Sequence, residues 1–303
     1  MLSATITLQI CACNRSGHDT QSCRIFVWIE VQMTENARNN ELWRQVLSGE
    51  YKDIPRARRL LKRIPCKVRC KICNAPLNGP GGRLIRLTLG RIPSRINPHF
   101  CSGCYDLLAA NPGSTEIEMT LLFADIRGST TLAQQMGTQA FSHLINRFYI
   151  TATHVFSESD AWIERLVGDQ VIGLYLPAMA GLNHAQIAIH SAQKLAHAVG
   201  YGGSDEAWLP LGIGVHTGYT FMGTVGSESG IRDFTVLGDT ANTAARLSSV
   251  AAAGEILISH SAGAHARIDT TGLEARTLEL KGRSEPIDVH VAHVDSPLVM
   301  ARV

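Results

Sequence analysis

Residues 121–130 read LLFADIRGST. The apolar residues before Asp125 predict a buried strand, and the Gly-Ser-Thr turn after it predicts a helix that begins near Thr131. The N-terminus of a helix presents free backbone N–H groups that bind phosphate. An adjacent carboxylate is a ligand that Mg²⁺ accepts together with phosphate oxygens. The stretch therefore predicts a strand, turn and helix that could hold a phosphate group and its cation.

A second acid follows in residues 164–169, which read ERLVGD. The Gly-Asp pair predicts a turn inside a hairpin over residues 167–176, so Asp169 could lie beside Asp125. Taken alone, Asp125 could be an acid at a helix N-terminus and Asp169 an ordinary turn residue.

Two polar residues lie on one predicted helix further along the chain. Residues 234–247 read FTVLGDTANTAARL, a short apolar strand and a Gly-Asp turn before the helix. Asn242 and Arg246 are four positions apart, so they share a helical face and could bind one ligand or could simply be solvated. Residues 211–225, which are rich in glycine, are expected to form two strands joined by a turn.

Five segments in this order resemble the catalytic domain of the class III nucleotide cyclases: FADIRGST, ERLVGD, GIGVHTG, FTVLGDTANTAARL and LKGR. The resemblance covers about residues 115–294. It implies that the ribose 3′-oxygen attacks the α-phosphate of a nucleoside triphosphate and that pyrophosphate leaves. It also implies two divalent cations, Mg²⁺ or Mn²⁺, at each active site.

The resemblance assigns roles to individual residues. Asp125, Asp169 and the carbonyl group of Ile126 would bind the two cations. Asn242 would orient the ribose, and Arg246 would stabilise charge on the α-phosphate. The remaining residues implied to bind phosphate are Gly128, Ser129, Thr130, Lys281 and Arg283, although the last two could be ordinary surface charges.

The positions that would read the purine base depart from the common pattern of the family. Arg165 stands where a lysine is usual, and Thr235 stands where an aspartate is usual; Tyr219 stands where some members have an arginine. A hydroxyl group both donates and accepts hydrogen bonds, so Thr235 is compatible with either purine. Members of the family that read guanine typically place an acid at these positions. We favour ATP because Arg165 and Thr235 supply none. The alternatives are a guanylate cyclase and a catalytically degenerate nucleotide-binding regulatory domain.

The predicted fold is an α+β, ferredoxin-like βαββαβ domain with extra C-terminal strands. It includes one helix up to about Phe156, a helix over residues 183–199, another over residues 240–250 and a strand over residues 255–259. The resemblance further implies a homodimer in which Asp125 and Asp169 of one subunit face the base-reading and α-phosphate residues of the other.

Two Cys-x-x-Cys pairs precede this region: Cys70 with Cys73, and Cys101 with Cys104, separated by 27 residues. Two such knuckles are typical of a tetrahedral zinc site, here one structural Zn²⁺ per chain. A redox pair and unligated buried thiols are the alternatives, and Cys66 could compete as a ligand. Turns are expected over residues 78–82 and 93–94.

The segment from Lys52 to Arg95 is strongly basic, with 13 Lys and Arg residues and one acid. It contains no Phe, Tyr or Trp, which argues against nucleic-acid binding. Docking on an acidic surface of the catalytic domain, or on another anionic surface, explains the charge equally well. With few large apolar residues, the module is expected to depend on its metal for folding, and the catalytic domain to fold without it.

These observations divide the chain into parts. Residues 1–32 are expected to be unstructured or to precede a true start at Met33; the other parts are a helical segment (33–65), a zinc-ribbon-like module (66–112), the catalytic domain (115–294) and a tail (295–303). No apolar run approaches the length of a membrane span. The cysteines fit a metal site in a reducing compartment, so we expect a cytoplasmic protein.

Overall fold

A computed structural model describes residues 21–66, 68–95, 100–204, 206–226 and 232–298; the side chains of residues 21–34, 165–167, 226, 232 and 233 lie outside this description. The chain divides into two units, Met1–Arg38 and Asn39–Val303. Apart from the start of helix α1, everything discussed below lies in the second unit. None of the described helices is long and apolar enough to cross a membrane.

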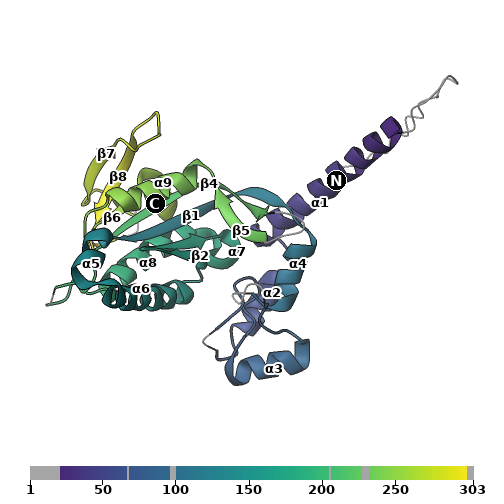
Figure 1. Cartoon of the computed structure of the whole chain (residues 1–303), viewed down its shortest axis with the longest axis horizontal. Coiled ribbons are helices and arrows are strands. Elements are labelled where there is room, and N and C mark those ends of the chain that lie inside the picture. The colour runs from purple at the N-terminus through teal and green to yellow at the C-terminus, as the bar shows by residue number, and fades with distance from the viewer. Residues whose placement is uncertain (1–20, 67, 96–99, 205, 227–231, 299–303) are drawn as a thin grey trace. The chain divides into compact units, whose positions relative to one another are not determined.

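The centre of the second unit is an eight-stranded sheet (Figure 1). Its strands are β1 Ser114–Ile126, β2 Trp162–Val167, β3 Gln170–Tyr175, β4 Leu211–Gly226, β5 Arg232–Leu237, β6 Ile256–Ser259, β7 Glu274–Leu278 and β8 Ile287–Ala292. The order is β2-β3-β1-β4-β6-β8-β7, and β5 pairs with β4. The strands β1 to β4, with helices after β1 and β3 and a tight turn between β2 and β3, confirm the ferredoxin-like prediction, and β6 to β8 are extra strands.

The helices between these strands are α5 Ser129–Met136, α6 Thr138–Glu158, α7 Pro177–Ala180, η1 Gly181–Asn183, α8 His184–Ala198, α9 Asp239–Val250 and α10 His260–Ala266. They cover both faces of the sheet because β1 is apolar on both. Leu122 and Ala124 pack with α6 and α8, whereas Leu121 and Phe123 pack in the cluster that contains Ala244 of α9. This alternation is the two-residue period of a strand.

The predicted hairpin over residues 211–225 is wrong: β4 is one continuous strand that pairs with the whole of β1. Its glycines do not form a turn. They allow α9 to pack closely against the strand. A Cβ atom on Gly214 would lie 2.7 Å from the carbonyl oxygen of Ala244, and one on Gly218 would lie 2.9 Å from Thr240 Oγ1. Glycine within a strand often marks such a close approach.

Two further expectations need correction. The single helix expected up to Phe156 is two helices, because Gly137 adopts φ 79° between α5 and α6. The turn expected over residues 78–82 is the start of helix α3, Gly79–Leu89. Pro80 fits there because the first turn of a helix needs no N–H group from that residue.

Helices precede the sheet in the described part of the chain. Helix α1, Gln21–Ser48, begins within the residues that were expected to be unstructured. Helix α2 Asp53–Leu61 precedes the cysteine module, and α4 Ser102–Ala110 lies within it and carries Cys104. The module shares its core with the eight-stranded sheet. The ring of Phe100 lies 4.8 Å from that of Trp162 and 5.9 Å from that of Phe234, and Phe100 is fully buried. Removing the module would expose these aromatic rings, which argues against independent folding of the catalytic domain.

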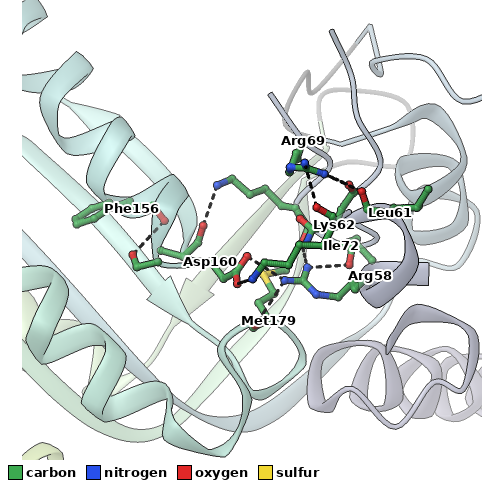
Figure 2. A network of polar contacts seen from close by, with 12 residues as sticks. Arg58, Leu61, Lys62, Arg69, Ile72, Phe156, Asp160 and Met179 are labelled. Carbon is green, nitrogen blue, oxygen red and sulfur yellow. Dashed lines mark hydrogen bonds and ion pairs between the residues drawn. The ribbon is translucent and has the colours of Figure 1, made fainter. Parts of the chain in front are cut away.

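Basic side chains of α2, of the residue after it and of the module also reach the sheet domain (Figure 2). Arg58 and Lys62 pair with the carboxylate of Asp160 at 3.4 and 3.2 Å. Lys71 Nζ donates to the carbonyl oxygen of Ala161 at 3.0 Å. Part of the positive charge of the basic segment is therefore paired with acceptors of the sheet domain.

Candidate active site

The two predicted metal-binding acids lie at the same end of the sheet, where β1 ends and β3 begins. Asp125 is near the end of β1, where it pairs with Gln170 of β3 and Gly212 of β4. The backbone N–H of Ile126 donates to the carbonyl oxygen of Asp169 at 3.1 Å. Gly168 adopts φ 62° and allows the tight turn that returns Asp169 to this position.

Each carboxylate already has a polar partner. Burial raises the pKa of Asp125, the Arg127 guanidinium that contacts Asp125 Oδ2 lowers it, and the nearby Asp169 raises it further. The balance is upward. The hydroxyl of Ser129 donates to Asp169 Oδ2. Arg127 was not identified from the sequence, although it follows Asp125 by two residues in the decisive stretch.

The turn after β1 opens toward solvent. Gly128 adopts φ 63° and directly precedes α5, and Gly128 and Thr130 are exposed. The first N–H groups of α5 are thus available next to the two acids. A triphosphate could approach the helix N-terminus and the acids together.

The other predicted residues gather around α9. Asn242 is exposed and Arg246 is half-buried. A Cβ atom on Gly282 would lie 3.0 Å from an Arg246 guanidinium nitrogen, so the LKGR turn rests against Arg246. Arg283 bonds Thr243 Oγ1 at 2.7 Å and Asp239 at 2.5 Å, whereas Lys281 is exposed. Arg283 is therefore committed to α9, and Lys281 is the freer of the two cations.

The positions predicted to read the base lie on β2 and β5. Arg165 pairs with Ile172 of β3, and its side chain lies outside the described part of the chain. Thr235 pairs with Gly223 of β4 and donates a hydrogen bond of 2.9 Å to the carboxylate of Glu164. An acid therefore stands beside Thr235 after all. Glu164 was not identified from the sequence, because it is not among the positions to which the resemblance assigns a role. Tyr219 is 69 % exposed on β4.

The four predicted zinc ligands come together. Cys70, Cys73, Cys101 and Cys104 are buried, and their sulfur atoms all lie within 4.8 Å of one another. Cys66 is not in this cluster; its thiol contacts Asn78 and the carbonyl oxygen of Val68. Arg91 reaches 3.2 Å from Cys101 Sγ, and a neighbouring cation of this kind favours thiolate over thiol.

Residues 114–292 match the family profile described as "Adenylate and Guanylate cyclase catalytic domain". The match spans more than half of the chain. The chain belongs to this family. The four-cysteine module lies outside the match.

Similar proteins include cyclases named for either purine. An adenylate cyclase from Anabaena cylindrica is 29 % identical over 138 residues, covering 43 % of this chain and 26 % of the relative. The retinal guanylyl cyclase 2 of Bos taurus is 29 % identical over 204 residues, covering 66 % of this chain and 18 % of the relative. The chain thus spans about a quarter or less of the length of these relatives.

Solved structures also resemble this chain. The adenylyl cyclase CyaB from P. aeruginosa superposes with a TM-score of 0.52 at 26 % identity, covering 61 % of this chain and 97 % of that one. The guanylyl cyclase Cya2 superposes with a TM-score of 0.53 at 24 % identity over the same shares, which supports the fold. Family membership therefore does not choose between ATP and GTP.

The raised pKa of Asp125 predicts the stability of a neutral variant. An acid whose folded pKa is above its unfolded value contributes stability below the unfolded pKa, near 3.9, and loses that contribution as the pH rises through the folded value. Ionised Asp125 therefore costs stability at pH 7. Metal-free Asp125→Asn protein should melt at the wild-type temperature or up to about 3 °C higher, as scanning calorimetry measures. A lower melting temperature would contradict this electrostatic assignment.

Proposed function

We propose that this protein is an adenylate cyclase that converts ATP into 3′,5′-cyclic AMP and pyrophosphate. The observation that carries the proposal is the convergence of Asp125 and Asp169 beside the open N-terminus of α5. In a chain of this family, such an arrangement suits a metal-bound triphosphate. Base choice remains part of the proposal.

The donor set fits two divalent cations. Carboxylates and a backbone carbonyl are the oxygen ligands that Mg²⁺ and Mn²⁺ prefer, and Asp125, Asp169 and Ile126 would supply them. Two like charges at one edge also favour a bound cation, since Asp169 raises the pKa of Asp125. When bound, the cations would lower the pKa of the ribose 3′-hydroxyl and neutralise phosphate charge.

The remaining roles fall to the protein itself. Gly128, Ser129 and Thr130 would present N–H groups to the phosphates at the start of α5. Asn242 would orient the ribose, and Arg246 would stabilise the charge that develops on the α-phosphate. Lys281, rather than the committed Arg283, would bind the outer phosphates.

The predicted residues form two groups, one at the acids and one at α9 with the LKGR turn. We assign these groups to opposite sides of a homodimer interface, so that each site takes its acids from one subunit and Arg246 from the other. Two equivalent sites would then form per dimer. The thiols of the cysteine cluster need reducing conditions, which suits the cytoplasm.

A guanylate cyclase is the second candidate, and Glu164 is the observation that favours it, because a carboxylate can accept from the donors of guanine. Incubation with ATP or GTP and Mn²⁺, with the product identified by mass spectrometry, tests both candidates. We expect cyclic AMP from ATP at several times the rate of cyclic GMP from GTP. A faster GTP reaction would assign guanylate cyclase, and absence of either product would indicate a degenerate regulatory domain.

The split site predicts complementation between inactive variants. Asp125→Ala removes metal ligands and Arg246→Ala removes the α-phosphate contact, so each homodimer should lose at least about 100-fold in rate. Mixing the two should restore activity, because one site of each heterodimer keeps every residue. The matched control is a mixture of Asp125→Ala with Asp169→Ala, which should stay inactive. Heterodimers that form without activity would place the whole site in one chain.

We also propose one structural Zn²⁺ at Cys70, Cys73, Cys101 and Cys104. Their burial and mutual distances suit a tetrathiolate site, and Arg91 would offset part of its negative charge. Phe100 directly precedes Cys101 and is fully buried against Trp162 and Phe234. Zinc would therefore stabilise the core that the module shares with the catalytic domain.

Zinc loss should accordingly destabilise the whole second unit. Cys101→Ser should lower the zinc content below about half an equivalent and lower the melting temperature by at least about 5 °C, while Cys66→Ser, outside the cluster, should change neither. Elemental analysis and calorimetry measure both quantities. Full zinc content in the Cys101→Ser protein would remove that ligand from the assignment.

A further inference from the structure

Strand β2 carries an extra residue at Glu164. Ile163 pairs with Gly173 of β3, and Arg165 pairs with Ile172, so a step of two residues on β2 faces a step of one on β3. This is a β-bulge, a feature that re-aims side chains and often occurs next to active sites. Glu164 falls between these two paired positions, so the regular alternation of the strand does not determine the direction of its side chain.

The carboxylate of Glu164 reaches β5. Thr235 Oγ1 donates to Glu164 Oε1 at 2.9 Å, across 71 positions of sequence, in a partly buried setting. Phe234 and Val236 on either side of Thr235 are buried, so the alternation of the strand places the threonine side chain on the opposite face of β5. A hydrogen bond to a charged acceptor is stronger than one between neutral groups.

This contact fixes the hydrogen-bonding role of Thr235. A hydroxyl group has one proton to donate and lone pairs that accept. With its proton directed to Glu164, the Thr235 oxygen can only accept from a further partner. At the corresponding position of the purine, adenine presents an amino group that donates, and guanine presents a carbonyl group that accepts.

We propose that Glu164 is a positioning residue for base selection: by accepting the proton of Thr235, it makes that oxygen an acceptor for the amino group of adenine. The inference rests on the proposed cyclase function and on the assignment of Thr235 to the base. It supplies a physical reason for ATP over GTP. The competing arrangement is direct contact between Glu164 and the donors of guanine, which would favour GTP.

The test compares Glu164→Gln with wild-type protein and with Glu116→Gln, an exposed glutamate on β1. A glutamine amide can donate or accept, so the threonine hydroxyl regains both roles. The ratio of kcat/KM for ATP to that for GTP should fall about 3- to 10-fold, the effect of one hydrogen bond, and Glu116→Gln should leave it unchanged. Competition of ATP and GTP against a fluorescent nucleotide should show the same shift without turnover.

A second background separates the two arrangements. Thr235→Val removes the hydroxyl, so Glu164→Gln added to it should change the ratio by less than about twofold if the glutamate acts through Thr235. An undiminished effect in that background would mean direct base contact and overturn the proposal. An unchanged ratio in Glu164→Gln, or a wild-type preference for GTP, would also overturn it.

The outcomes distinguish this proposal from the function on which it rests. If the protein turns over ATP but Glu164→Gln leaves the ATP-to-GTP ratio of kcat/KM unchanged, Glu164 has no role in base selection and the cyclase function stands. Absence of turnover would remove the cyclase, while the competition assay would still support or overturn the effect of Glu164 on base preference. Glu164→Ala carries the same expectation and serves if the glutamine variant does not fold.

Discussion

The antiparallel pairing of β1 with β4 is the constraint on which the site depends. The two strands pair without interruption from Ser114 opposite Gly223 to Ile126 opposite Leu211. Because β1 is buried on both faces, a slip of one residue would exchange its two sets of apolar side chains. The register that packs Leu121 toward one layer and Leu122 toward the other also fixes Asp125 at the end of β1, next to the β2–β3 turn. The acids are thus positioned by the core.

Sequence reasoning succeeded where a local pattern determines the outcome. The run before Asp125 is a strand, the Gly168 turn returns Asp169 beside it, and the two Cys-x-x-Cys pairs close into one cluster. It failed at β4, because the same glycines are compatible with a turn and with close packing of a helix. Only the position of α9 against Gly214 decides between these possibilities.

The module illustrates a second limit. Its own segment has few large apolar residues, and so it was expected to be a small module that depends on its metal for folding. Phe100 lies just beyond the basic segment, and its partners Trp162 and Phe234 come from strands distant in sequence. A core assembled from three distant segments has no local periodicity by which it could be recognised. The positive charge was visible, but its partner Asp160 was one acid among many.

Strand β5, to which we assign a role in reading the base, is held by two different kinds of interaction. Thr235 is fixed by a hydrogen bond to Glu164, and its neighbour Phe234 packs on Phe100, Trp162 and Tyr105. Apolar packing resists displacement of the strand but leaves a hydroxyl free to rotate, whereas the hydrogen bond orients the hydroxyl but is too weak to hold a strand. Both are needed for a fixed acceptor at one point. Since Phe100 adjoins Cys101, the packing on one side of Thr235 includes a residue bonded to the cysteine cluster.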